Sequence, residues 1–105
     1  MASVLIVDDS PTETYKMEVA LKKNGFEVFK ADNGMDGVAA AKKHLPDLVL
    51  MDVVMPGLNG FQATRQLTQA KETAHIPVII VTTKDQQTDK LWGKRQGAKG
   101  YLVKP

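Results

Sequence analysis

Leu48-Val49-Leu50-Met51-Asp52 is a short apolar run that ends in a carboxylate. Three further runs also end in a chemically active side chain: residues 4–7 before Asp8-Asp9, residues 78–81 before Thr82, and residues 101–103 before Lys104. Short runs that are apolar throughout are typical of strands buried on both faces of a parallel sheet. If these strands are neighbours, their carboxyl ends lie along one edge. That edge then holds three carboxylates, one hydroxyl and one ammonium.

The segments between these runs carry helix signals. Ser10-Pro11-Thr12-Glu13 has a capping serine, a proline at the first helical position and a glutamate that can reach back. Met17, Ala20 and Leu21 predict an apolar stripe along this helix, and Asn24-Gly25 predicts its end. The other expected elements are a strand at 27–31, a helix from 33 to about 44, a helix beginning at 59 and broken before 78, a helix at about 85–95 ended by Gly97, and a strand at about 100–103.

Alternation of strands and helices predicts an α/β fold with a doubly wound five-stranded parallel sheet. The strand at 27–31 is partly polar, which places it at an edge, whereas the uniformly apolar runs are central. This favours the flavodoxin-like strand order 2-1-3-4-5. In that order the switch point lies between the first and third strands, where Asp8, Asp9 and Asp52 emerge.

Composition limits the functional classes. The chain has 105 residues, which suits one domain, and a net charge of +2 without a long basic block, so we expect no nucleic acid partner. The absence of cysteine excludes disulfides and cysteine-ligated zinc. No apolar stretch approaches the ~20 residues of a membrane span, and no signal peptide is evident. We therefore expect a cytoplasmic protein without membrane insertion.

Three carboxylates in one place repel each other unless a cation compensates them. Oxygen ligands favour Mg²⁺, Mn²⁺ or Ca²⁺, and Mg²⁺ fits best beside a phosphoryl group because it bridges to phosphate oxygens. Thr82 and Lys104 can bind the other phosphoryl oxygens. A carboxylate can itself act as the nucleophile and form an aspartyl phosphate.

Taken together, these motifs resemble the receiver domain of bacterial two-component response regulators. The resemblance covers residues 1–105 and rests on Asp8-Asp9, on Asp52 followed by Met55-Pro56-Gly57-Leu58-Asn59-Gly60, on Thr82 and on Lys104-Pro105. More narrowly, residues 53–65 and 92–97 resemble the single-domain regulators of type IV pilus twitching motility.

The resemblance implies a role for each matching residue. Asp52 accepts a phosphoryl group from a histidine kinase, and Thr82 and Lys104 contact that group. Asp9 and Asp52 bind Mg²⁺, with Mn²⁺ as a possible substitute, together with the backbone carbonyl of Val54, while Asp8 acts mainly through water. Tyr101 is the aromatic switch residue. The only chemistry is self-catalysed phosphorylation and dephosphorylation, and the output is a changed surface for a downstream motility or signalling protein.

Two other functions stay open at this point. A Mg²⁺-dependent phosphohydrolase could use the same aspartyl nucleophile, although such enzymes have a second aspartate two residues later, where this chain has Val54. An interaction module that never needs phosphate is the other alternative. Loss of function in an Asp52→Asn variant would distinguish a phosphate-controlled switch from such a module.

Receiver domains continue into a fifth helix after the Lys-Pro pair, so we expect this chain to be truncated at its C-terminus. Without that helix, an apolar part of the sheet at its first, third and fifth strands should be exposed. Such a patch favours self-association.

Overall fold

The computed structural model describes residues 2–83 and 87–104. The expected start of the last helix at 85, and Pro105, therefore lie outside the described residues. Within these ranges five strands alternate with four helices. The elements are β1 (Ser3–Val7), α1 (Pro11–Lys23), β2 (Glu27–Ala31), α2 (Gly34–His44), β3 (Leu48–Met51), α3 (Gly60–Gln69), β4 (Val78–Thr82), α4 (Gln87–Arg95) and β5 (Gly100–Val103).

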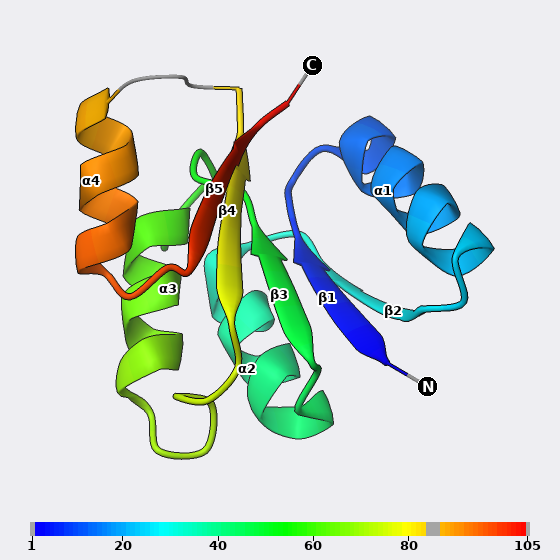
Figure 1. Ribbon diagram of the computed structural model, residues 1–105, viewed down its shortest axis with the longest axis horizontal. Helices are drawn as coiled ribbons and strands as arrows, with labels where there is room; N and C mark the ends of the chain where they lie inside the picture. The colour runs from blue at the N-terminus through cyan, green and yellow to red at the C-terminus, as the bar shows by residue number, and fades with distance from the viewer. Residues whose placement is uncertain (1, 84–86, 105) are drawn as a thin grey trace.

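The strands form one parallel sheet in the order β2-β1-β3-β4-β5, which confirms the predicted fold. Ile6 of β1 pairs with Leu50 of β3, which in turn pairs with Ile79 of β4. Helices α2, α3 and α4 cover one face of the sheet, and α1 lies on the other face beside β1 and β2 (Figure 1). All strands therefore end at the same edge, where β1, β3 and β4 deliver their polar residues.

The main core lies between the sheet and the three helices that share one face. Alternate strand residues point into it, because successive side chains of a strand face opposite sides of a sheet. Leu5, Val49 and Ile80 are completely buried there, and Leu67 of α3 packs against them from above the sheet. This core holds β1, β3 and β4 in register and so fixes the relative positions of the side chains that follow them.

The face that carries α1 is covered less well. Helix α1 has no buried residue: Met17 and Leu21 are half-buried and Ala20 is exposed, so the predicted stripe is wrong at Ala20. The expected exposure of β1 is also wrong, because α1 covers that strand and every residue of β1 is buried. The uncovered apolar area lies on β3 and β5, as expected, and also on β4: Leu50 and Ile79 are half-buried and Leu102 is 57% exposed. Among the described residues, no helix is long and apolar enough to cross a membrane.

Candidate functional site: a carboxylate cluster at the switch point

Three carboxylates meet at the carboxyl ends of β1 and β3. Asp8 and Asp9 follow β1 and Asp52 follows β3, and one carboxylate oxygen of each lies within 4.8 Å of the others. The adjoining backbone is paired, because the Asp52 N–H donates to the Val7 carbonyl at 2.8 Å and the Asp8 N–H donates to the Ala31 carbonyl at 3.0 Å. Asp8 and Asp52 are buried, whereas Asp9 is exposed. The cluster thus has two buried carboxylates and one that faces solvent.

Lys104 is the cation of this cluster. Its Nζ donates to Asp8 Oδ2 at 2.7 Å and lies 3.7 Å from Asp52 Oδ1. The side chain of Lys104 is only 7% exposed, so the ion pair with Asp8 is shielded from water. The second oxygen of Asp8 accepts the Ser10 N–H at 2.9 Å, at the start of α1. Asp8 therefore links β1, α1 and the end of β5.

Thr82 of β4 and Tyr101 of β5 lie on the two strands beyond β3, on the side of the cluster that faces α4. Thr82 ends β4 with 1% of its surface exposed, and its carbonyl accepts the Lys104 N–H at 2.7 Å. Tyr101 is half-buried against the core and lies beside α4 at Gly93, where an added Cβ would be 3.8 Å from Tyr101 Cδ2. The structure therefore places Thr82 at the cluster and Tyr101 between the sheet and α4.

The loop from Val53 to Asn59 is anchored at both ends. Val53 and Met55 are buried, and Gly57 adopts a positive φ of 73° that side chains with a Cβ rarely tolerate. At the far end, Asn59 and Gln62 form a complete capping box that starts α3. Gly60 packs directly on the Asp52 carbonyl and leaves no space for a Cβ. The loop is therefore held against the residue that the sequence predicts as the acceptor.

Burial and charge alter the acid–base behaviour of the cluster. Desolvation raises the pKa of Asp52 above its ordinary value of 3.8, and the negative charge of Asp8 raises it further, although Lys104 opposes both effects. Burial disfavours the Lys104 ammonium, but its hydrogen bond to Asp8 and the charge of Asp52 outweigh this and raise its pKa. Asp52 is thus a carboxylate whose negative charge is only partly compensated, which is the condition that favours an added cation.

The cluster fits a small divalent cation. Oxygens around an octahedral Mg²⁺ with ligands at about 2.1 Å lie about 3.0 Å apart when adjacent and about 4.2 Å apart when opposite. The three carboxylates each offer an oxygen within 4.8 Å of the other two, so a small inward movement brings them into this range. Both oxygens of Asp8 already have donors, from Ser10 and Lys104, so Asp9 and Asp52 are the better direct ligands. Val54 extends its side chain into solvent, 59% exposed, on the loop that follows Asp52. The donor set consists of oxygen atoms, which suits Mg²⁺ or Mn²⁺.

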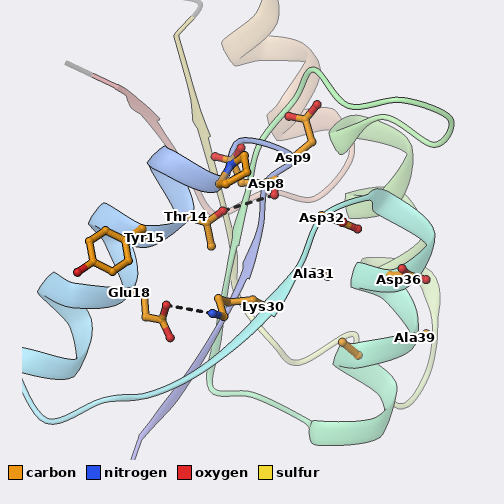
Figure 2. A pocket seen from close by; sticks show the side chains of 12 residues that line it. Asp8, Asp9, Thr14, Tyr15, Glu18, Lys30, Ala31, Asp32, Asp36 and Ala39 are labelled. Atoms are coloured by element: carbon orange, nitrogen blue, oxygen red, sulfur yellow. Dashed lines mark hydrogen bonds and ion pairs between the residues drawn. The ribbon is translucent and has the colours of Figure 1, made fainter.

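A cavity of about 740 Å³ extends from Asp8 and Asp9 between α1 and α2. Figure 2 shows its walls: Tyr15 and Glu18 come from α1, with Glu18 paired to Lys30 of β2 at 3.1 Å. Sequence reasoning missed this cavity. The only signal in the sequence was the spacing of Thr14 and Glu18, which places them on one face of a helix. The small side chains of Ala31, Ala39 and Ala40 leave the cavity open, but alanines do not indicate a functional site in a sequence.

Comparison with known proteins identifies the family. The response regulator receiver domain matches residues 4–105. Protein PilH of Pseudomonas aeruginosa is 70% identical over 105 residues, which cover 100% of this chain and 87% of PilH. This relative supports the narrower resemblance to the regulators of type IV pilus twitching motility.

Solved structures agree with this match. Chemotaxis protein CheY4 of Vibrio cholerae has a TM-score of 0.95 at 35% identity. The superposition covers 100% of this chain and 88% of the CheY4 chain. The receiver domain of a sensor histidine kinase from Pseudomonas aeruginosa has a TM-score of 0.91 at 30% identity. That superposition covers 99% of this chain and 85% of the kinase receiver chain. That structure has a magnesium ion coordinated in its active-site cleft. The chain described here therefore belongs to the family of response regulator receiver domains of two-component signalling systems.

Proposed function

We propose that this receiver domain is a phosphorylation-controlled switch in which Asp52 accepts a phosphoryl group from a histidine kinase. The observation that carries the proposal is the position of Asp52, which is buried at the end of β3 beside the carboxylate of Asp8 and 3.7 Å from the ammonium of Lys104. The match to PilH supports a role in twitching motility, with a downstream motility or signalling protein as partner. We place the switch in the cytoplasm, where nucleoside triphosphates supply the phosphoryl groups that kinases transfer.

The transfer needs little beyond positioning and charge compensation. A carboxylate oxygen of Asp52 attacks phosphorus, the bond from phosphorus to the donor breaks, and the donor leaves with the bonding electrons. Asp9, Asp52 and the carbonyl of Val54 would hold Mg²⁺, and the ion would neutralise part of the charge on the phosphoryl oxygens. Lys104 then exchanges Asp8 for a phosphoryl oxygen. Attack by water on the phosphorus then breaks its bond to the Asp52 oxygen, which releases inorganic phosphate and returns the carboxylate. Transfer and slow hydrolysis are the only chemistry that we propose.

Movements of Thr82 and Tyr101 transmit the effect of phosphorylation to the surface that binds a partner. The Thr82 hydroxyl binds a phosphoryl oxygen and moves toward Asp52, which changes the space available to Tyr101 beside α4. Tyr101 packs partly on the core and partly at the surface, so a small shift changes what α4 and β5 present to a partner. For such a change to be driven by phosphate, the site must bind the phosphoryl group better in one arrangement than in the other.

Labelling with acetyl phosphate and Mg²⁺ tests the proposal. We expect one phosphoryl group per parent chain by intact-mass spectrometry and none in Asp52→Asn. The variant should be at least as stable as the parent at pH 7, because it removes a buried charge, and this advantage should shrink as the pH falls through the raised pKa of Asp52 toward 3.8. Loss of labelling therefore cannot come from unfolding. Asp32→Asn, an exposed neighbour, is the matched control. Equal labelling of Asp52→Asn and the parent would exclude Asp52 as the acceptor.

We also propose that the uncovered apolar area of β3, β4 and β5 mediates self-association of this 105-residue chain. Leu50, Ile79 and Leu102 form its centre. Contiguous apolar surface of this kind is a contact site for other chains. Light scattering should show a mass that rises with concentration, and Leu102→Lys should return it to that of a monomer. A parent chain that stays monomeric throughout the concentration series contradicts the proposal.

A further inference from the structure

We propose that Asn24, in the turn between α1 and β2, is the first asparagine of this chain to deamidate spontaneously and to form an isoaspartyl residue (Figure 1). The chain has three asparagines, at positions 24, 33 and 59, and a glycine follows each of them. Because glycine has no Cβ, it leaves its own backbone nitrogen open to react with the preceding side chain. The sequence therefore contains three Asn-Gly pairs that are equivalent in local chemistry, and the structure distinguishes them.

The reaction takes place within one Asn-Gly pair and needs only water. The glycine nitrogen attacks the side-chain carbonyl carbon of asparagine, and a carbon–nitrogen bond forms. The amide nitrogen leaves as ammonia and takes the proton of the glycine N–H. Water then opens the cyclic succinimide at one of its two carbonyls and gives aspartate or isoaspartate. Ring closure requires the asparagine side chain and the following peptide group to turn toward each other, so the freedom of these two groups decides the rate.

The Asn59-Gly60 pair is held on both sides. Asn59 Oδ1 accepts the Gln62 N–H at 2.9 Å within the capping box of α3. The Gly60 N–H donates to the Val53 carbonyl at 2.9 Å, and Gly60 is buried directly against the backbone of Asp52. The peptide group between Asn59 and Gly60 therefore cannot turn without moving the acceptor loop.

The side chain of Asn33 is held by three hydrogen bonds. Its Oδ1 accepts the Asp36 N–H at 2.8 Å, and its Nδ2 donates to the carboxylates of Asp32 at 2.9 Å and Asp36 at 2.8 Å. Gly34 is buried against the Leu58 carbonyl, with no space for a Cβ. Rotation at Asn33 would break the cap of α2 and would take from two carboxylates the amide that they share. This pair is also held in place.

The restraints on Asn24 are fewer and face solvent. Asn24 and Gly25 are both exposed, and the Asn24 Nδ2 donates to the Ala20 carbonyl at 2.7 Å on the surface of α1. The backbone bonds at this end of α1 include that from the Gly25 N–H to the Lys22 carbonyl at 3.0 Å, in a turn where helices fray. Among the described residues, none lies within 4 Å of a Cβ built on Gly25. The turn can therefore open without displacing packed side chains.

Deamidation at Asn24 changes how α1 is attached to the rest of the fold. The new carboxylate lies at the negative end of the helix dipole, and it cannot donate to the Ala20 carbonyl as the amide does. Isoaspartate also lengthens the backbone between α1 and β2. Because α1 has no buried residue, it depends strongly on its ends to stay on the sheet. The modified chain should therefore unfold at a lower urea concentration than the parent.

Incubation of the folded parent chain at mildly alkaline pH, followed by proteolysis and mass spectrometry, tests the inference. The peptide that contains Asn24 should convert at least about tenfold faster than those that contain Asn33 or Asn59, equivalent to a barrier lower by about 1.4 kcal/mol. Methylation by a protein isoaspartyl methyltransferase counts the isoaspartyl groups, and it should nearly disappear in Asn24→Gln. Asn59→Ser, which keeps a capping oxygen, is the matched control and should accept as many methyl groups as the parent.

The same incubation in concentrated urea separates the effect of the fold from that of the sequence. There the three peptides should convert at similar rates, because each Asn-Gly pair is free to turn. Equal rates in the folded chain, or faster conversion at Asn33 or Asn59, overturn the inference. A preference for Asn24 that is unchanged in urea also overturns it, because the fold would then not be its cause.

Discussion

Lys104→Ala should lower the free energy of unfolding by about 3–5 kcal/mol at pH 7 without divalent cations, the cost of removing one partner from a buried ion pair. The Lys104 side chain is 7% exposed and donates to Asp8 at 2.7 Å. Its removal leaves Asp8 and Asp52 buried with two negative charges and no cation among their described neighbours. Urea denaturation followed by circular dichroism measures the change.

The pH dependence of this loss has a definite sign. The pKa of Lys104 is raised above 10.5, so its ion pairs are complete at pH 7 and are lost only as the pH rises through the raised value. At low pH, Asp52 takes up its proton earlier than an ordinary aspartate because its pKa is also raised, and the repulsion that Lys104 relieves then falls. The difference between parent and variant should therefore shrink as the solution is acidified.

An exposed lysine provides the control for this substitution. Lys99→Ala should change stability by no more than about 0.5 kcal/mol. Addition of Asp8→Asn to Lys104→Ala should recover part of the loss, because it removes one of the two uncompensated charges. Equal stability of Lys104→Ala and Lys99→Ala at pH 7 would show that the ion pairs of Lys104 do not stabilise the cluster.

Gly60→Ala should lower the free energy of unfolding by about 3 kcal/mol, the upper end of the cost of over-packing. The added Cβ would meet the backbone of Asp52 and Val53, which cannot rotate away as a flexible side chain can. The substitution therefore has to move the start of α3 away from the acceptor loop. Urea denaturation gives the stability, and the rate of acetyl phosphate labelling, which should also fall, reports the position of Asp52.

Gly93→Ala is the matched control, because Gly93 is also a helical glycine. Its added Cβ would meet Ile80 and Phe61 at 3.4 Å, an ordinary contact distance. Alanine also favours a helix interior by roughly 0.5–1 kcal/mol. Gly93→Ala should thus be neutral or slightly stabilising. If both substitutions cost the same, the close approach of Gly60 to Asp52 has no energetic importance.

The sequence predicted those parts of the fold that depend on local patterns. Apolar runs such as residues 48–51 are strands because each is too short for a helix and is bounded by turn residues, and the order of the strands followed from which runs lacked polar residues. The clustering of Asp8, Asp9 and Asp52 followed directly from that topology.

Features that depend on contacts between distant elements were not predictable in this way. The position of α1 decides that β1 is buried and that exposure falls on β3, β4 and β5, and no periodicity within α1 reveals its position. The preference of Lys104 for Asp8 over Asp52 depends on a difference of 1 Å between two distances of 2.7 and 3.7 Å. The cavity between α1 and α2 depends on the separation of two helices on opposite faces of the sheet.

The contact between Lys104 and Asp8 joins residues 96 positions apart and so links the segment after β5 to the segment after β1. Contacts of such high sequence separation form late or slowly in folding, because most of the chain must first be ordered to bring their partners together. A folding chain in which β5 is not yet paired with β4 has the three carboxylates in place without the ammonium group of Lys104. The ammonium group that lies beside Asp8 and Asp52 therefore reaches them only when β5 has joined the sheet.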